Sequence, residues 1–401
     1  MDTLLLYTHH SVGIGHLMRS LSIARALARH FRIVVVCGGR IPDFDCQPPG
    51  VEMVSLPYLI ISQQGSWIAP DGDTAQRMLA ERQRILLETF ERVRPAVVVI
   101  EFFPFGRMQY ASELLALLEK ARWSADRPLI ISSIRDLLER RREHQLIYDD
   151  LASVLCNHLY DAVLVHSDPK FIRFEESFLP SVPMRAPLHY TGYVQPYSAT
   201  LPADPEVNVE NGMVVSCGGG HGHARELLQT ALQAYLDHLQ HHQLPLLLLG
   251  GQFIPKPEWD SLQDAVAAVP GVQLRRWVSN LSSVLRQAAV SVSQFGYNTF
   301  LDIVASGVPA VVVPYESPLD EEQVQRATRM ERLKAIRLVP FKELSPERLA
   351  NEIEAALHSS ARQFSIDVNG ATRTAEIIYG LYAERKQKQL CGQAVPALEI
   401  A

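Results

Sequence analysis

Residues Val290–Gln323 read VSVSQFGYNTFLDIVASGVPAVVVPYESPLDEEQ, and this stretch decides the fold. An apolar strand over 290–293 enters a turn with Gly296, and a helix over about 298–306 leads to a second apolar strand over 310–314. Continuous Val-rich strands joined by a helix are typical of parallel sheets that are buried on both faces. The stretch therefore predicts an α/β fold whose ligand site lies beyond the carboxyl ends of its strands.

The turn of this stretch has the features of a phosphate-binding site. Gly296 permits close approach of the backbone to a ligand. The helix opened by Asn298 and Thr299 offers free N–H groups and the positive end of its dipole. Asp302 follows one turn later, where its carboxylate could accept hydrogen bonds from a ribose diol. An ordinary crossover with a solvated aspartate is the alternative interpretation of a lone glycine turn.

A second glycine turn lies near the start of the chain. The strand Thr3–Tyr7 leads to Gly13-Ile14-Gly15-His16-Leu17-Met18-Arg19, and an amphipathic helix follows. The third glycine of a dinucleotide fingerprint is replaced and no acidic residue ends the next strand, so a nicotinamide cofactor is not expected. His16 could act as a general base, or it could only cap the helix. The preceding His9 and His10 are not expected to be catalytic.

Further charged residues follow strand ends. Glu101 comes directly after an apolar strand over 96–100, and it is a second candidate acid or base unless it caps the next helix. Arg135 follows a strand over 129–133 and could meet an anionic acceptor. The side chains of Arg140–Arg142 point to different sides of a predicted helix, so a solvated face is favoured over a single anion clamp.

A third glycine turn, CGGGHGH at residues 217–223, follows the strand Gly212–Ser216. Glycines at this position permit close backbone approach to a charged ligand. His221 and His223 could be metal ligands together with His16, but no carboxylate or cysteine completes a set at local spacing. No metal ion is therefore expected.

The composition bounds the class of protein. A chain of 401 residues exceeds what one core usually supports, so two domains are expected. A net charge of −6 lacks the basic balance of nucleic-acid-binding proteins. Five cysteines with no CxxC pair indicate neither a disulfide framework nor a zinc site. No apolar run reaches the roughly 18 residues that span a membrane, so a cytoplasmic location with at most peripheral membrane contact is expected.

Changes in composition also predict the domain boundaries. The first domain is expected over residues 1–194, and a Pro-rich, polar linker without periodicity follows over 195–211. The second domain should span 212–365. A terminal helix over 366–386 and a tail over 387–401 complete the chain.

Together these motifs resemble those of GT-B glycosyltransferases, in particular family 28, the group related to the N-acetylglucosaminyltransferase of lipid II synthesis, and a set of predicted glycosyltransferases. The resemblance covers nearly the whole chain and is most specific over 296–323. It implies two Rossmann-like domains that face each other across a cleft, the first for an acceptor and the second for a nucleotide sugar. It also implies that the terminal helix packs back on the first domain.

The resemblance assigns roles by position. His16 is the expected catalytic base, with Glu101 as its alternative. Asp302 stands where the family has a ribose-binding glutamate, and Val278 is expected to contact uracil through backbone atoms. Contacts with the donor sugar are expected from Glu322 and Gln323. The remaining donor-binding residues, at or near the diphosphate, are Gly15, Gly218, Gly219, Gly220, Phe295, Gly296, Tyr297, Asn298 and Thr299.

The expected function is transfer of a hexose-type sugar from a UDP-sugar to an acceptor hydroxyl, with inversion and without a metal ion or cofactor. The acceptor is a small molecule, a glycan or a lipid-linked group. An apolar loop over 57–73 could cover the acceptor, contact a membrane surface or fold into the core. One alternative is hydrolysis of the same donor, as in a related hydrolase of nonulosonic-acid synthesis, but the long segment 46–73 offers room for an acceptor. Another is a non-catalytic partner that binds a sugar nucleotide.

Overall fold

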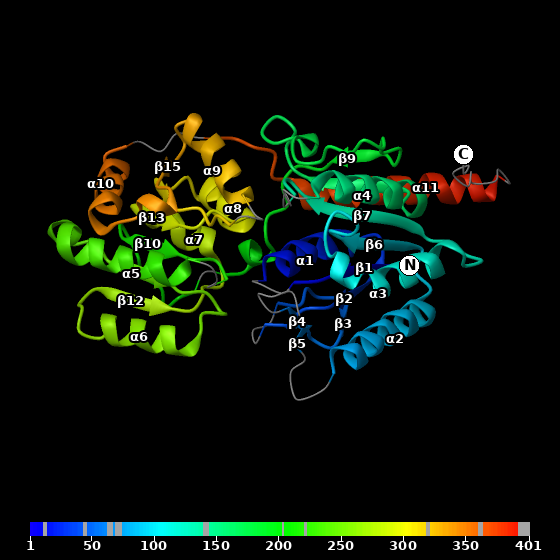
Figure 1. Cartoon of the computed structure of the whole chain (residues 1–401), viewed down its shortest axis with the longest axis horizontal. Helices are drawn as coiled ribbons and strands as arrows, with labels where there is room; N and C mark the ends of the chain where they lie inside the picture. The colour runs from blue at the N-terminus through cyan, green and yellow to red at the C-terminus, as the bar shows by residue number, and fades with distance from the viewer. Residues whose placement is uncertain are drawn as a thin grey trace. The chain divides into compact units, whose positions relative to one another are not determined.

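The structure, a computed structural model, describes residues 1–10, 14–42, 46–61, 67–68, 74–138, 144–202, 204–219, 223–317, 321–359 and 364–391. The chain forms two compact units (Figure 1). Unit 1 comprises Met1–Ser11, His16–Gln195 and Ile366–Ala401, and unit 2 comprises Val12–Gly15 and Pro196–Ser365. Each unit is an α/β fold built on a parallel sheet.

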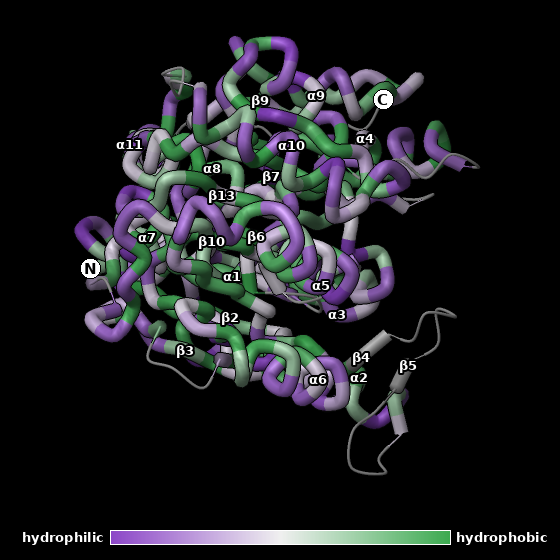
Figure 2. Tube along the Cα trace, turned by 90° about the vertical axis from the view of Figure 1, so that its left-hand side faces the viewer, coloured by the Kyte–Doolittle hydropathy of each residue, from purple (hydrophilic) through white to green (hydrophobic). Residues whose placement is uncertain are grey.

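The described part of unit 1 contains a seven-stranded sheet in the order β3-β2-β1-β6-β7-β8-β9, and all neighbouring strands are parallel. The strands are apolar runs such as RIVVVC in β2, which carries the hydrophobic colour in Figure 2. Their bounds are β1 (Thr3–Thr8), β2 (Arg32–Cys37), β3 (Val51–Ser55), β6 (Val97–Glu101), β7 (Leu129–Arg135), β8 (Ala162–His166) and β9 (Leu188–Tyr190). A separate antiparallel pair, β4 (Ile60–Ile61) and β5 (Trp67–Ile68), lies in the predicted apolar loop, whose other residues 62–66 and 69–73 are outside the described ranges.

Helices cover both faces of this sheet, because successive strand residues point to opposite sides. Leu5 and Tyr7 of β1 belong to the core that packs on α2, α3 and α4, whereas Leu4 and Leu6 belong to the core under α1 and α11. The terminal helix thus packs on unit 1. The helices are α1 (Gly15–Leu27), α2 (Ala75–Val93), α3 (Ala111–Arg122), α4 (Gln145–Leu159) and α11 (Gly370–Leu390).

In unit 2 the described residues form a six-stranded sheet in the order β12-β11-β10-β13-β14-β15, again with all neighbours parallel. One face packs on α5 and α10. The strands are β10 (Met213–Ser216), β11 (Leu246–Leu249), β12 (Val272–Arg275), β13 (Val290–Ser293), β14 (Ala310–Val312) and β15 (Arg337–Leu338). The helices are α5 (Ala224–Ala234), α6 (Lys256–Val266), α7 (Leu281–Leu285), α8 (Tyr297–Ser306), α9 (Glu322–Arg332) and α10 (Pro346–Leu357).

Several predicted bounds need correction. The helix α8 begins at Tyr297, one residue early, and ends where Gly307 takes a left-handed φ of 69° that glycine adopts without strain. The strand β14 stops at Val312, two residues before the predicted end. The terminal helix continues to Leu390, so the predicted tail begins too early. No helix in the described ranges is long and apolar enough to cross a membrane.

Both sheets share one strand order. In unit 1 the first strand, β1, lies between β2 and β6. In unit 2 the first strand, β10, lies between β11 and β13. Connections run to opposite sides from that point, and ligands of α/β proteins bind beyond the carboxyl ends of the two strands that meet there. We call the loops after β1 and β6 the unit 1 switch point, and the loops after β10 and β13 the unit 2 switch point.

Candidate active site

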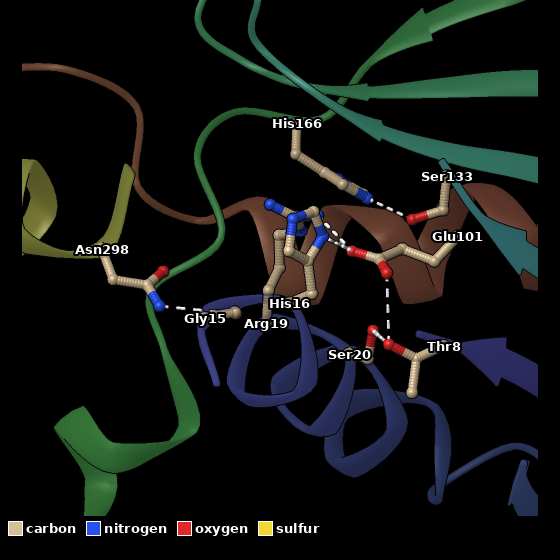
Figure 3. A network of polar contacts seen from close by, with 9 residues as sticks. All are labelled: Thr8, Gly15, His16, Arg19, Ser20, Glu101, Ser133, His166 and Asn298. Carbon is tan, nitrogen blue, oxygen red and sulfur yellow. Dashed lines mark hydrogen bonds and ion pairs between the residues drawn. The ribbon is translucent and has the colours of Figure 1, made fainter. Parts of the chain in front are cut away.

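The unit 1 switch point brings His16 and Glu101 together. His16 lies in the first turn of α1, and Glu101 is the last residue of β6. His16 Nδ1 lies 2.6 Å from Glu101 Oε1, and Arg19 forms an ion pair with the same oxygen (Figure 3). Arg19 is three residues after His16, a spacing that puts both side chains on one face of the helix. The two residues predicted as alternative bases therefore form one pair.

Glu101 is enclosed by the fold, with an exposed fraction of 2%. Its Oε2 accepts a hydrogen bond from Thr8 Oγ1 at 3.2 Å, and Ser20 Oγ donates to Thr8 Oγ1 at 3.1 Å. Burial alone would raise the pKa of Glu101, but the contacts with His16 and Arg19 outweigh burial and hold this pKa below its usual value. Glu101 is thus a buried, ionised carboxylate.

His16 is neutral at physiological pH. Burial lowers its pKa to about 3, although the neighbouring Glu101 acts in the opposite direction. The short contact with an ionised carboxylate assigns the ring proton to Nδ1, which donates to Glu101. The lone pair of Nε2 can then accept a proton. The side chain keeps 15% of its surface exposed, so a ligand can reach it.

His166, at the end of β8, lies beside this pair, and the sequence analysis did not select it (Figure 3). It is fully buried, its Nε2 lies 2.7 Å from Ser133 Oγ, and its Nδ1 lies 2.9 Å from Thr191 Oγ1. Burial lowers the pKa of His166 to about 3. Because both ring nitrogens have partners, His166 supports the site. Its position at a strand end was the one available signal.

His9 and His10 are packing residues. Both are buried, and a Cβ atom on Gly38 or Gly39 would lie 2.4 Å from Nδ1 of His9 or His10 respectively. Gly38 and Gly39, in the loop after β2, thus leave the space that the rings of His9 and His10 fill. The ring of His9 also lies 3.9 Å from the ring of Tyr110. Neither His9 nor His10 contacts the His16–Glu101 pair.

At the unit 2 switch point, Gln323 of α9 holds the turn between β13 and α8. Its Oε1 accepts hydrogen bonds from the backbone N–H groups of Phe295 at 2.8 Å and Tyr315 at 3.1 Å. One side chain therefore joins the ends of β13 and β14.

Gly296 in this turn has an ordinary φ of −60°, and an added Cβ would meet only Gln323 Nε2, at 3.9 Å. No described residue would clash with a side chain here, and close approach of a ligand to Gly296 stays a prediction. The side chains of Phe295, Tyr297 and Thr299 are buried, so only their backbone groups can face a ligand. The helix α8 begins at Tyr297 without a side-chain cap hydrogen bond. Asn298 Nδ2 donates to the carbonyl of Gly15, which groups with unit 2, at 3.4 Å.

Arg326 is a residue of this region that the sequence analysis missed. It is fully buried, and its Nη1 donates to the Phe295 carbonyl at 2.9 Å. Its Nη2 lies 3.5 Å from Oε1 of Glu322, which is also buried. The i, i+4 spacing of Glu322 and Arg326 in a helix was a signal that could have revealed this pair. Glu322 therefore contributes to the support of the turn.

Asp302 lies against the start of α7. Burial raises its pKa to about 7, while the charge of Arg286 and a hydrogen bond from the Ser282 N–H act in the opposite direction. The exposed fraction of Asp302 is 7%. Its contact with a ribose stays a prediction.

The remaining predicted donor residues surround the carboxyl edge of the same sheet. Gly218 follows β10 and has a left-handed φ of 55°, and Gly219 is half-buried. Gly220 lies outside the described residues. Val278 follows β12 and is half-buried. The ring of His223 stacks on the ring of Phe341, with 3.5 Å between the ring centres.

Among the described residues, His241, His242 and Glu354 lie close enough together to hold a metal ion, because their ligand atoms are within 4.8 Å of one another. The nearest histidine nitrogens are 3.7 and 3.8 Å from Glu354 Oε1. These residues belong to the turn after α5 and to α10, at neither switch point. His221 is not among the described residues.

Comparisons with known proteins bear on this geometry. Residues 214–378, most of unit 2, match the glycosyltransferase family 28 C-terminal domain. Unit 2 thus carries a family 28 C-terminal domain, and the chain has the GT-B fold. The whole unit 2 switch point lies inside the matched residues, so the glycine turns described above are those of the family domain.

The chain is similar to a curated relative from Thermotoga neapolitana, UDP-N-acetylglucosamine--N-acetylmuramyl-(pentapeptide) pyrophosphoryl-undecaprenol N-acetylglucosamine transferase. The identity is 28% over 94 residues, which are 23% of this chain and only 28% of the relative. Solved structures share the fold over more of the chain. The calicheamicin glycosyltransferase CalG4 has a TM-score of 0.56 and 20% identity, covering 98% of this chain and 100% of that one. MurG of Acinetobacter baumannii has a TM-score of 0.53 and 13% identity, covering 94% and 99%.

Proposed function

We propose that this protein transfers a hexose-type sugar from a UDP-sugar to an acceptor hydroxyl, with inversion and without a metal ion. The observation that carries the proposal is the 2.6 Å contact between His16 Nδ1 and the buried carboxylate of Glu101 at the unit 1 switch point. The Thermotoga neapolitana relative is named for a UDP-N-acetylglucosamine donor, which supports a UDP-sugar as the donor here.

His16 is the general base of the proposed reaction. Its Nε2 takes the proton of the acceptor hydroxyl while the hydroxyl oxygen attacks the anomeric carbon. Positive charge develops on the imidazole, and the carboxylate of Glu101, hydrogen-bonded to Nδ1, stabilises it. Because Glu101 is buried and engaged by Arg19 and Thr8, it orients His16 and does not itself remove the proton.

The same step breaks the bond between the anomeric carbon and UDP, and a single displacement inverts the configuration of that carbon. Negative charge then falls on the diphosphate. The positive end of the α8 dipole and the backbone N–H groups of Asn298 and Thr299, together with the backbone at Gly218 and Gly219, stabilise this charge in place of a divalent cation.

The other donor contacts follow from the same site. Asp302 receives the ribose hydroxyls, and Val278 contacts the base through its backbone. Of the two residues predicted at the donor sugar, Gln323 is better placed, because its Nε2 lies beside Gly296 while Glu322 pairs with Arg326.

A thermal-unfolding screen of UDP-, GDP- and ADP-sugars on the whole chain tests the donor. A UDP-sugar at a hundredfold excess over its Kd should stabilise the protein by about 2.7 kcal/mol. Gly296→Ala is the matched variant, because the fold has room for its Cβ. It should unfold like the wild type without ligand and lose most of the ligand-induced shift. A screen in which no UDP-sugar stabilises the chain, or in which Gly296→Ala keeps the full shift, would overturn the proposed donor site.

A further inference from the structure

The loop after β6 has an uncommon backbone conformation and lies beside His16, the proposed general base. Phe102 and Arg107 both have left-handed backbone conformations, with φ of 67° and 62°, which are uncommon for residues with side chains. A Cβ atom on Gly106 would lie 2.4 Å from the Phe102 ring, so the ring rests on this glycine. The same ring meets the ring of His16 edge to face, with 5.8 Å between centres. The loop thus places Arg107 near the His16–Glu101 pair.

Arg107 forms no direct ion pair with any residue that the structure describes, although its charge helps to lower the pKa of the buried Glu101 carboxyl group. Arg19 pairs with Glu101, and Arg82 pairs with Glu113. The Arg107 side chain forms neither an ion pair nor a hydrogen bond with any described residue, and its Nε is buried without a partner. Buried donors usually have a partner in folded proteins. Because Arg122 Nη1 and Arg385 Nε are in the same state here, a ligand at Arg107 is inferred from its position beside His16 as well.

Two observations place the Arg107 guanidinium on the side of the catalytic pair. The guanidinium carbon of Arg107, Cζ, lies 5.7 Å from the centre of the Phe102 ring, and that ring contacts the ring of His16. Burial is the main cause of the lowered pKa of both His9 and His16, and the charge of Arg107 adds to the effect in each case. Arg107 is therefore close enough to act on the base electrostatically.

A pocket with both polar and apolar walls adjoins this guanidinium, and Arg107 is one of its lining residues. The carboxylate of Asp149, also in the lining, already accepts hydrogen bonds from Gln145 Nε2 at 2.7 Å and from the Leu179 N–H at 2.9 Å. Apolar and aromatic side chains make up most of the remaining wall: Phe102, Phe105, Met108, Tyr148 and Phe178.

We propose that Arg107 binds an anionic group of the acceptor, a phosphate or a carboxylate, while an adjoining apolar or aromatic part of the acceptor occupies this pocket. The inference rests on the proposed function, because it names the chemical class of the acceptor. A guanidinium suits both anions, since it donates paired hydrogen bonds to two oxygen atoms. A bound anion would also offset the charge of Arg107 and so make His16 a stronger base when the acceptor is present.

Calorimetric titration of the whole chain tests the inference with phenyl phosphate, phenylacetate and neutral benzyl alcohol. Each probe is titrated both without nucleotide and at saturating UDP, because UDP occupies the phosphate site of unit 2. UDP binding is measured first, so that failure of the donor proposal is recognised separately from failure of the acceptor inference. The variants are Arg107→Gln, Arg107→Lys and, as the control, Arg84→Gln, which removes an exposed arginine of α2 that pairs with Glu81 and Glu88.

At least one anion should bind at one site at least tenfold more tightly than benzyl alcohol, with or without UDP. Which anion binds better identifies phosphate or carboxylate as the preferred group. Arg107→Gln should weaken that anion tenfold or more, Arg107→Lys should weaken it less, and Arg84→Gln should leave it unchanged. Equal binding of the anions and benzyl alcohol, no saturable anion binding, or unchanged affinity in a folded Arg107→Gln or Arg107→Lys would each overturn the inference.

Discussion

Asp302 carries a buried carboxyl group whose protonation changes near neutral pH. Its pKa in the folded chain, about 7, lies above its ordinary value of 3.8 because of burial. The folded chain therefore holds this proton more tightly than the unfolded chain does. The resulting stabilisation is complete below about pH 4 and is lost as the pH rises through 7. At about 1.4 kcal/mol per pKa unit, the effect is of order 4 kcal/mol.

This titration provides a test of the ribose contact. Only the ionised Asp302 accepts hydrogen bonds from both ribose hydroxyls, so the affinity for a UDP-sugar should rise about tenfold from pH 6 to pH 8. The Asp302→Asn variant should bind more weakly and show no such rise. Calorimetry at several pH values measures both, and a UDP-sugar has no group of its own that titrates in this range. A flat wild-type affinity, with only the stability changing, would assign Asp302 to the fold alone.

At the scale of elements, the helix α9 anchors the turn that faces the donor. Gln323 in its first turn holds the backbone at the ends of β13 and β14, and Arg326 holds the Phe295 carbonyl from one turn later. The shape of the β13–α8 turn thus depends on a helix that follows it in the chain.

Gln323→Ala should lower both stability and donor affinity. Each backbone N–H left without an acceptor costs about 1–3 kcal/mol, and the turn loses its anchor in the same change. Gln325→Ala on the same helix is the control, because the structure shows no side-chain hydrogen bond for Gln325 among the described residues. Urea unfolding and UDP calorimetry give the two readouts. A Gln323→Ala variant as stable as Gln325→Ala, with normal UDP affinity, would contradict this role. A larger loss for UDP-sugar than for UDP would add a contact with the sugar.

The sequence predicts the elements of residues 290–314 to within two residues, because Val-rich runs and the glycines at 296 and 307 mark their ends. The anchoring contacts of Gln323 could not be predicted in this way. Its partners are 28 and 8 residues away, and the contacts arise only when α9 packs beside the turn. Helical spacing could have paired Glu322 with Arg326, but not with the Phe295 carbonyl.

At the scale of the whole molecule, each unit repeats one design, in which the first strand lies beside the strand that carries the second half of the site. The positions of His16 and Glu101 after strand ends were predictable, because the carboxyl ends of parallel strands share one edge of a sheet. Their partnership was not, since it depends on β1 and β6 being neighbours, and strand order is set by packing. The place of Arg107 beside the pair was likewise not predicted, because it depends on the backbone conformation of the loop after β6.

The central claim is that His16 removes the acceptor proton while the donor binds elsewhere. The measurement is the rate of UDP release from the UDP-sugar selected by the donor screen, with water and a panel of alcohols and glycosides as acceptors, alongside the Kd of UDP. His16→Ala should lower the rate by about 10² to 10⁴ and leave the Kd of UDP within about twofold, because a general base acts in the transition state. Glu101→Gln, which removes the charge that supports the imidazolium, should lower the rate less. A folded His16→Ala that releases UDP within a few-fold of the wild-type rate, or that loses UDP affinity in proportion to the rate, would contradict the account.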